Sequence, residues 1–364
     1  MIHITLTLEK TLGPIVRAVL KKIAVITTGG TIASRADAFG AQVAAVPGAD
    51  LLASVTIPAG VTAEVRDLFS VNSYAMTLSR MDQVRWAVNE ALLEPQIQGV
   101  VVAHGTDTLE ETAFLIELFH SDPSPVVFTG AQRSADTPGS DGPSNLGDAI
   151  ALAASPAAAE LGVLIMFDGV VHSARGARKT HTTALAAFSD PDFGPLGHLE
   201  RGELVLHSRP VRSAPLGFPI ADFTDIQVDI VTLYPDVSAT ALDAYAAAGA
   251  RGLVLEATGM GNANPEIVAA VARHVTDGIH VILSTRVNAG PVRPVYGGGG
   301  GGHDLMAAGA ISAGYLRPSQ ARIQLASLLA CGANKDQIFN SFRPDPHRAE
   351  ANQSASPYPA KELS

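Results

Sequence analysis

Short, continuous apolar runs alternate along the chain with stretches of helical periodicity. Runs typical of buried strands occur in the first half at Ile23–Ile26, Val100–Ala103, Val126–Phe128 and Val163–Phe167. Apolar residues at helical spacing lie between or beside these runs, at Leu78–Leu93, Leu109–Phe119 and Leu146–Ala159. Strands that are apolar throughout suit a sheet covered on both faces, and their alternation with helices favours a parallel α/β arrangement.

A proline-containing segment, Arg209–Asp225, interrupts this pattern. A second series follows, with expected strands at Val228–Leu233, Gly252–Leu255 and Val281–Leu283 and expected helices at Ala239–Ala248, Pro265–Thr276 and Ser319–Leu329. We therefore predict an α/β protein. A larger N-terminal domain (residues 1–208) has a mostly parallel sheet flanked by helices, a linker spans 209–227, and a smaller C-terminal α/β domain spans 228–364. The glycine tract Gly297–Gly302 is expected to be loop, and the polar tail after Arg343 to be loosely ordered.

The composition supports a large core and argues against several partner classes. The chain is 47% hydrophobic and 16% charged, which argues against extensive disorder. Its net charge of -10 gives no global reason to bind nucleic acid or an anionic membrane. The one cysteine, Cys331, excludes an intrachain disulfide and a cysteine metal cluster, and its apolar surroundings indicate a core residue.

No targeting or membrane segment is recognised in the sequence. No stretch approaches the roughly 18 apolar residues of a membrane span. Glu9 and Lys10 interrupt the first apolar run, which argues against a secretory signal. We therefore expect a cytoplasmic protein.

The segment Thr27–Thr31 (TTGGT) follows the first expected strand, and ligands of open α/β sheets sit at the carboxyl ends of strands. The paired glycines, Gly29 and Gly30, let the backbone approach a ligand and turn amide N–H groups toward it. Thr31 would then be a hydroxyl beside potential oxyanion donors. A plain turn or a phosphate-binding loop also fits, although the lysine of the phosphate-binding motif is missing.

The segment His104–Thr108 (HGTDT) lies between another expected strand and a helix. Thr108 with Glu111, or Asp107 with Glu110, would form a capping box, so the segment alone is explained by helix initiation. His104 alone is best explained as a structural histidine.

A third segment, Arg175–His181, contains Lys179 and by itself is typical of a solvated basic face. A lysine near a Thr–Asp pair would form a proton-accepting unit, because the carboxylate orients the amine and partial desolvation favours its neutral form. Such a unit activates a weak hydroxyl nucleophile.

Taken together, the motifs resemble those of the bacterial-type L-asparaginase and glutaminase-asparaginase family. The ordered set is TGGTIAS (Thr28–Ser34), VVAHGTDTLEETA (Val101–Ala113), FTGAQR with SDGPSNL (Phe128–Arg133, Ser140–Leu146), RKTHTT with FGPLG (Arg178–Thr183, Phe193–Gly197) and, more weakly, LRPSQAR (Leu316–Arg322). The resemblance covers about Lys22 to Phe342, and GGTIA followed by HGTDTLEET is highly specific.

The resemblance implies hydrolysis of the side-chain amide of L-asparagine, and of L-glutamine as a second substrate, to the acid and ammonia. Thr31 matches the family's nucleophile. Thr106, Asp107 and Lys179 match a triad that activates the attacking hydroxyl or water. Ser73 matches a serine that binds the substrate carboxylate, and Asp107 would also bind the α-amino group.

The resemblance also implies further contacts and an assembly. Gly105 and Ala131 lie where the family offers backbone groups to the amide, beside the Gly30 turn. Asn264 matches a residue that reaches a neighbouring subunit's site. The family uses no cofactor or metal, and it assembles as dimers of dimers, so a homotetramer is expected.

Three positions differ from the common family pattern. No tyrosine occurs between Thr31 and Ser73, where a lid tyrosine is usual, and Phe39 is the aromatic residue nearest to Thr31 in that interval. Tyr74 stands where a small polar or amide residue is common. Gly297–Asp304 lacks the glutamate that many members place near a neighbouring subunit's substrate amine. These three differences bear on the rate of amide hydrolysis and on which substrate side chain is preferred.

Two other functions remain open at this stage. One is the ammonia-producing subunit of a tRNA-dependent amidotransferase, which would want an additional N-terminal domain and a basic RNA-facing surface; the short segment before the first expected strand and the net charge of -10 count against it. The other is a non-catalytic small-molecule binder on the same fold, and the joint presence of Thr31, Thr106, Asp107 and Lys179 counts against that.

Overall fold

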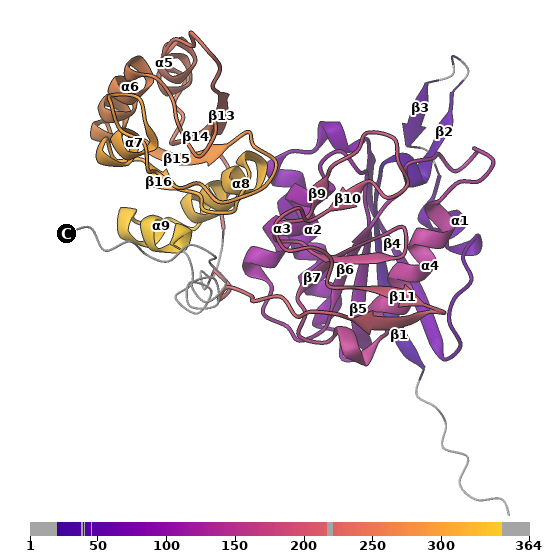
Figure 1. Cartoon of the computed structure of the whole chain (residues 1–364). Helices are drawn as coiled ribbons and strands as arrows, with labels where there is room; N and C mark the ends of the chain where they lie inside the picture. Colours follow the sequence, from indigo (N-terminus) through magenta and orange to yellow (C-terminus); the bar gives the residue numbers. More distant parts are fainter. Residues whose placement is uncertain (1–19, 38, 40, 45, 217–220, 344–364) are drawn as a thin grey trace, which may run out of the picture.

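The computed structural model describes residues 20–37, 39, 41–44, 46–216 and 221–343, and it consists of two α/β domains that lie side by side (Figure 1). In spatial order, the large sheet contains β12 (Glu203–Leu206), β11 (Gly197–Glu200), β8 (Val170–Ser173), β7 (Val163–Phe167), β6 (Val126–Thr129), β5 (Ile97–Ala103), β1 (Lys21–Gly29) and β4 (Val61–Val71). The strands from β4 to β7 are parallel, and β8, β11 and β12 add antiparallel pairs at the other edge. The predicted α/β class is confirmed, with a large mixed sheet.

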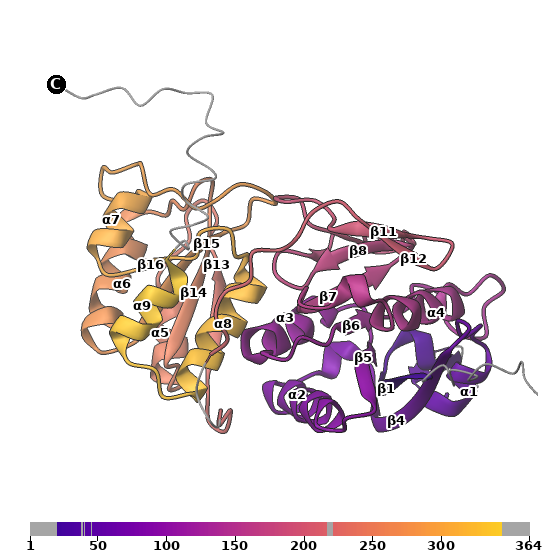
Figure 2. The ribbon, with the colours of Figure 1, turned by 90° about the horizontal axis from the view of Figure 1, so that it is seen from below.

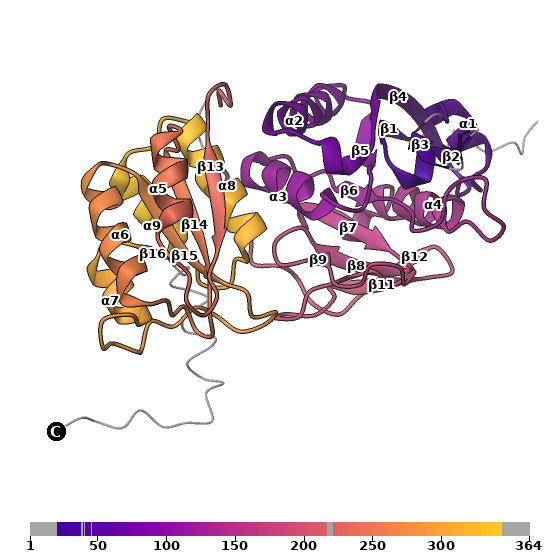
Figure 3. The ribbon, with the colours of Figure 1, turned by 90° about the horizontal axis from the view of Figure 1, so that it is seen from above.

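Helices cover both faces of this sheet (Figure 3). The helices α2 (Leu78–Leu92) and α3 (Leu109–Phe119) pack on one face, and α1 (Gly48–Ala53) and α4 (Gly142–Ala153) pack on the other. Within β1, Ala24 and Ile26 join the first core cluster, while Ile23 and Val25 join the second. Burial on both faces explains why the strands are apolar at consecutive positions.

The helix predicted at Leu146–Ala159 has different bounds. It begins at Gly142, with Pro143 in its first turn, and ends at Ala153. A separate 3-10 turn, η3, covers Pro156–Ala158. Pro156 has no N–H to continue the helix and disfavours helical backbone at the residue before it, so the apolar periodicity runs past the true helix end.

The smaller domain has a parallel sheet of β13 (Val228–Thr232), β14 (Gly252–Ala257), β15 (His280–Thr285) and β16 (Ile311–Ser312). One face packs against α5 (Thr240–Ala247), α6 (Pro265–Thr276) and α7 (Gly302–Ala307), and the other against α8 (Pro318–Ala330) and α9 (Lys335–Phe342). Gly302 is the first residue of α7, so the glycine tract is loop only up to Gly301, which corrects the prediction for that residue.

Helix α8 joins the two domains. It is buried almost all round, including the polar residues Gln320, Gln324 and Ser327, and it lies between the small sheet and α3 (Figure 2). One core cluster therefore runs from the large sheet through α3 and α8 into the small sheet. Residues 207–216 and 221–227 contain no helix or strand. The domain limits stay a prediction, and the tail after Arg343 lies outside the described residues.

Several short elements surround the large sheet. A two-stranded ribbon pairs β9 (Arg178–Lys179) with β10 (Phe188–Ser189), and another pairs β2 (Ser34–Ala36) with β3 (Gln42–Ala44). Two 3-10 turns follow strands, η1 (Thr31–Ala33) after β1 and η2 (Ser73–Ala75) after β4. Among the described helices, none has the length and apolar character needed to cross a membrane.

Candidate active site

The carboxyl ends of β1 and β5 bring the two glycine-threonine loops together. The two strands are parallel neighbours, and the Thr28 hydroxyl donates a hydrogen bond to the Ala103 carbonyl at 3.2 Å. Gly30 has φ 81°, and a Cβ atom there would lie 2.2 Å from the Gly105 Cα atom. The loops therefore touch backbone to backbone, at a position that excludes any side chain.

Thr106, Asp107 and Lys179 form one hydrogen-bonded group. The Lys179 Nζ atom donates to the Thr106 Oγ1 atom at 2.9 Å and to the Asp107 Oδ1 atom at 2.9 Å. Thr106 is buried, whereas the Asp107 side chain is 54% exposed. The group is thus held on the protein side and open on the other, which leaves room for a small polar molecule to reach the carboxylate and the threonine hydroxyl.

Ser73 lies directly beside this group, on η2. Its hydroxyl is buried and accepts a hydrogen bond from the Asp107 backbone N–H at 3.1 Å. The Thr108 hydroxyl donates to the Ser73 carbonyl at 2.9 Å. Thr108 is the N-cap residue of α3 but makes no side-chain cap bond. The predicted capping boxes are therefore wrong, because the Thr108 hydroxyl and the Glu110 carboxylate bond to other segments.

His104 is fully buried under the Thr106 loop. Its Nδ1 atom donates to the Gly105 carbonyl at 2.7 Å, and its Nε2 atom lies 3.1 Å from the Thr112 hydroxyl. Burial lowers the pKa of His104 to about 4. The hydrogen bond to Gly105 raises this pKa by less than burial lowers it, so the ring is neutral near pH 7. These contacts agree with the structural role expected for this histidine.

Thr31 and Ala131 flank the group. Thr31 follows Gly30 directly and is half-buried, and its hydroxyl makes no hydrogen bond within the part of the chain that the structure describes. Ala131 is buried and follows Gly130, where a Cβ atom would lie 3.2 Å from the Thr106 methyl group. Both residues thus belong to the same cluster of strand ends as Thr106.

Tyr74 and Asn264 are placed differently. Tyr74 is 74% exposed, and its hydroxyl accepts a hydrogen bond from the Asn72 amide at 3.0 Å. Asn264 caps α6 in the smaller domain, accepting from the Ile267 N–H and donating to the Val237 carbonyl. These hydrogen bonds of the Asn264 side chain stay within that domain.

Sequence reasoning missed the contact between Glu110 and Lys179. Glu110 is half-buried, and its carboxylate accepts a hydrogen bond from the Lys179 backbone N–H at 2.5 Å. The signal in the sequence is its place in the TDTLEET motif, which on its own predicts a capping partner.

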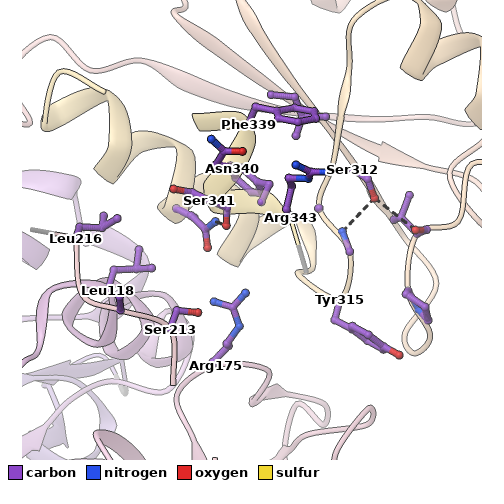
Figure 4. A pocket seen from close by; sticks show the side chains of 18 of the residues that line it. Leu118, Arg175, Ser213, Leu216, Ser312, Tyr315, Phe339, Asn340, Ser341 and Arg343 are labelled. Carbon is purple, nitrogen blue, oxygen red and sulfur yellow. Dashed lines mark hydrogen bonds between the residues drawn. The ribbon is translucent and has the colours of Figure 1, made fainter. Parts of the chain in front are cut away.

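A separate cavity lies away from this group. It measures about 640 Å³ and is lined by residues of both domains, including Leu118, Arg175, Tyr315, Phe339 and Arg343 (Figure 4). None of Thr31, Thr106 and Lys179 lines it. Over the residues that are described, no cluster of three or more His, Cys, Asp or Glu side chains is arranged to hold a metal ion.

Comparison with known proteins identifies the family. The N-terminal asparaginase domain model matches residues 22–212, and the glutaminase/asparaginase C-terminal domain model matches residues 227–342. A probable L-asparaginase of Deinococcus radiodurans is 37% identical over 335 residues, covering 89% of this chain and 98% of that protein. The crystal structure of a probable cytoplasmic L-asparaginase from Campylobacter jejuni superposes with a TM-score of 0.79 at 30% identity, covering 88% of this chain and 99% of the other.

A second group of relatives carries a different function. A glutamyl-tRNA(Gln) amidotransferase subunit of Thermofilum pendens is 33% identical over 338 residues, covering 87% of this chain and 72% of that protein. The matches to both domain models, together with relatives aligned over most of their length, show that this chain is an amidohydrolase of the L-asparaginase and glutaminase-asparaginase family.

Proposed function

We propose that the protein hydrolyses the side-chain amide of L-asparagine to L-aspartate and ammonia. The observation that carries the proposal is the Lys179 Nζ atom at 2.9 Å from both the Thr106 hydroxyl and the Asp107 carboxylate, beside the Thr31 loop. A hydroxyl next to an amine and a carboxylate is the arrangement that proton transfer from an alcohol or water requires.

The reaction proceeds in two halves. The Thr31 hydroxyl attacks the amide carbon, its proton passes to the Thr106–Lys179 pair, and that proton then goes to the departing nitrogen, so that ammonia leaves and an ester on Thr31 remains. Water attacks the ester, the same pair accepts its proton, and the Thr31 oxygen takes a proton as L-aspartate departs. The backbone N–H group of Ala131 stabilises the tetrahedral oxyanions, whereas the Gly30 N–H already donates to the Val71 carbonyl at 3.0 Å.

The amino-acid end of the substrate is held by Ser73 and Asp107. The Asp107 carboxylate is exposed enough to pair with an α-ammonium, and the Ser73 hydroxyl lies 3.1 Å from the Asp107 backbone nitrogen. Tyr74 borders this end, and Gly105 supplies close backbone approach to the amide. L-Glutamine is a second, weaker substrate.

The assembly is a homotetramer, a dimer of dimers, in which Asn264 of one chain approaches the site of another. The hydrogen bonds of Asn264 to α6 and Val237 hold its segment rigid for such a contact. We infer a cytoplasmic location, in line with the description of the Campylobacter jejuni relative. No cofactor is required.

Ammonia release from L-asparagine, measured with a coupled glutamate dehydrogenase assay, tests the proposal directly. Release that depends on Thr31 and Thr106 supports it. A purified, folded chain that binds asparagine without releasing ammonia is a binder instead.

A second candidate, ammonia supply to a tRNA-dependent amidotransferase, is favoured by the similarity to the Thermofilum pendens amidotransferase subunit. It predicts that release from free amino acids is slow until charged tRNA and a partner protein are added. Rapid turnover of free L-asparagine by this chain alone rejects that alternative.

A further inference from the structure

Lys179 sits on a strand that offers little support of its own. The strand β9 contains only Arg178 and Lys179, and it pairs with the equally short β10. A lysine side chain has four rotatable bonds, and ordering it costs up to about 2 kcal/mol. The position of the Nζ atom therefore depends on how firmly the main chain of Lys179 is anchored.

The anchor in the structure is the carboxylate of Glu110 on α3. Its Oε2 atom accepts a hydrogen bond from the Lys179 backbone N–H at 2.5 Å. Its Oε1 atom accepts a hydrogen bond from the Ser319 hydroxyl at 3.3 Å, and Ser319 lies on α8 of the smaller domain. One carboxylate thus connects β9, α3 and the C-terminal domain.

Both ends of Lys179 consequently bond to a single stretch of chain. The Nζ atom bonds to Thr106 and Asp107, and the backbone N–H bonds to Glu110, in the first turn of the helix that those residues lead into. Only Glu110 lies within the helix, whose backbone bonds fix its position. The lysine is therefore held at two points by one short segment, Thr106–Glu110, that leads into α3.

Glu110 lies in surroundings that disfavour its charged form. Burial raises the pKa of Glu110 to about 7, against the opposing effect of the Lys179 N–H bond. Of the charged groups facing it, Glu111 raises this pKa and Arg178 lowers it. Burying a carboxylate is costly, so its presence indicates a specific task for its two oxygens.

We propose that Glu110 is a positioning residue for the reaction: it fixes the main chain of Lys179 relative to Thr106 and Asp107, and through Ser319 it couples that position to the C-terminal domain. This inference rests on the proposed function, because positioning Lys179 matters for the reaction only if Lys179 takes part in proton transfer. A displacement of about 1 Å at a catalytic group is enough to cost about 100-fold in rate.

The neighbouring Glu111 provides a matched control. It is on the same helix, burial raises its pKa as well, and the charge that opposes this shift is Arg322. It makes no contact with Lys179 among the hydrogen bonds and ion pairs of the described residues. Replacing Glu111 therefore removes a half-buried carboxylate from the same turn of α3 without removing a hydrogen bond to Lys179.

The first experiment compares variants in the full chain by ammonia release. Glu110→Gln keeps the reach and an acceptor oxygen but loses the charge, whereas Glu110→Asp keeps the charge and shortens the reach. We expect kcat to fall by about tenfold or more in Glu110→Asp and by about threefold or less in Glu110→Gln and Glu111→Gln, with KM nearly unchanged in all three. A reversed order, with Glu110→Gln slower than Glu110→Asp, overturns the proposal, as does an equal loss in the Glu111 control.

The second experiment needs no turnover. Hydrogen–deuterium exchange of the peptide containing Arg178 and Lys179 reports the bond between the Lys179 N–H and Glu110. We expect about tenfold faster exchange in Glu110→Ala and unchanged exchange in Glu111→Ala. Unchanged exchange in Glu110→Ala overturns the anchor. If the wild-type chain releases no ammonia but the exchange result holds, the catalytic proposal fails while the anchoring of Lys179 stands.

Discussion

The two threonine loops occupy equivalent places but differ in how their hydroxyl groups are held. Both follow parallel neighbouring strands, and their glycines touch. Thr106 is buried and its hydroxyl accepts a bond from Lys179. Thr31 is half-buried and its hydroxyl makes no hydrogen bond within the described residues.

This difference suits two distinct chemical roles. A proton acceptor works best at a fixed distance from its partner, and the Thr106 hydroxyl is held 2.9 Å from the Lys179 Nζ atom. A nucleophile has to move onto the carbon it attacks, and a hydroxyl held only through its backbone keeps that freedom. The difference is in line with our proposal that Thr31 attacks and Thr106 transfers the proton, and both proposed roles can be tested by experiment.

The largest effect is expected from the threonines themselves. Thr31→Ala and Thr106→Val should each lower kcat by about two or more orders of magnitude, and the double variant should be far from additive because the groups act as a unit. Circular dichroism and the unfolding midpoint control for misfolding. Near-full turnover in either single variant removes that threonine from the mechanism.

Lys179→Met should be the next most damaging change, with a loss of about 100-fold. Without the amine, the Thr106 hydroxyl has no group to which it can pass its proton, so kcat should fall while KM changes little. The measurement is kcat and KM for L-asparagine at a single pH. Near-full turnover in Lys179→Met would falsify the assignment of Lys179.

Dilution tests whether a second copy of the chain completes the site around the Thr31 loop. If neighbouring chains contribute to each site, activity per chain should fall severalfold as the protein is diluted to monomer. Light scattering on the same samples gives the oligomeric state. A fully active monomer rejects the shared site but leaves the chemistry of Thr31 and Thr106 intact.

Substrate choice is a smaller effect. Asparagine and glutamine differ by one methylene, which shape discrimination converts into about 1–3 kcal/mol. We expect kcat/KM to favour L-asparagine by about tenfold or more, because Ser73 and Asp107 fix one end of the substrate and the threonines the other. Equal use of both amides refutes this preference.

The role of Tyr74 in that choice is tested separately. The residue is 74% exposed in the single chain, so any crowding of the longer substrate requires the ring to turn inward when substrate binds. Tyr74→Gln should then reduce the preference for L-asparagine. If the ratio of the two kcat/KM values is unchanged, Tyr74 has no part in selection.

The smallest effect concerns His104, the buried histidine that packs under the Thr106 loop. The pKa of His104 falls from 6.5 in an unfolded chain to about 4 in the fold, so the unfolded state binds the extra proton and stability is lost as pH falls from 6.5 toward 4. Acidification to below about pH 4 should therefore lower the free energy of unfolding by on the order of 3 kcal/mol through His104. His104→Gln should be less stable than wild type at about pH 7, with a gap in urea unfolding that narrows by about pH 4.5. A constant gap contradicts the buried neutral histidine.

Much of the scaffold follows from local pattern. The bounds of β7, α3 and α6 agree with those expected from the sequence, because each is a continuous apolar run or a clear helical stripe ending at a polar residue. The strand β4 was not expected. It lies at the sheet edge, mostly half-buried, and charged residues such as Glu64 and Asp67 break its apolar pattern.

The sequence by itself determined the α/β class, the family motifs and the residue types at the strand ends, since these depend on local periodicity and on the chemistry of individual side chains. Only the tertiary structure decided which of them meet. Lys179 reaches Thr106 across 73 positions, and Ser319 reaches Glu110 across 209. Local periodicity predicts neither contact. The strand β9 has only two residues, and the Glu110 carboxylate is placed by the packing of α3 against α8. Contacts so distant in sequence form only when the sheet, its helices and the second domain have packed together.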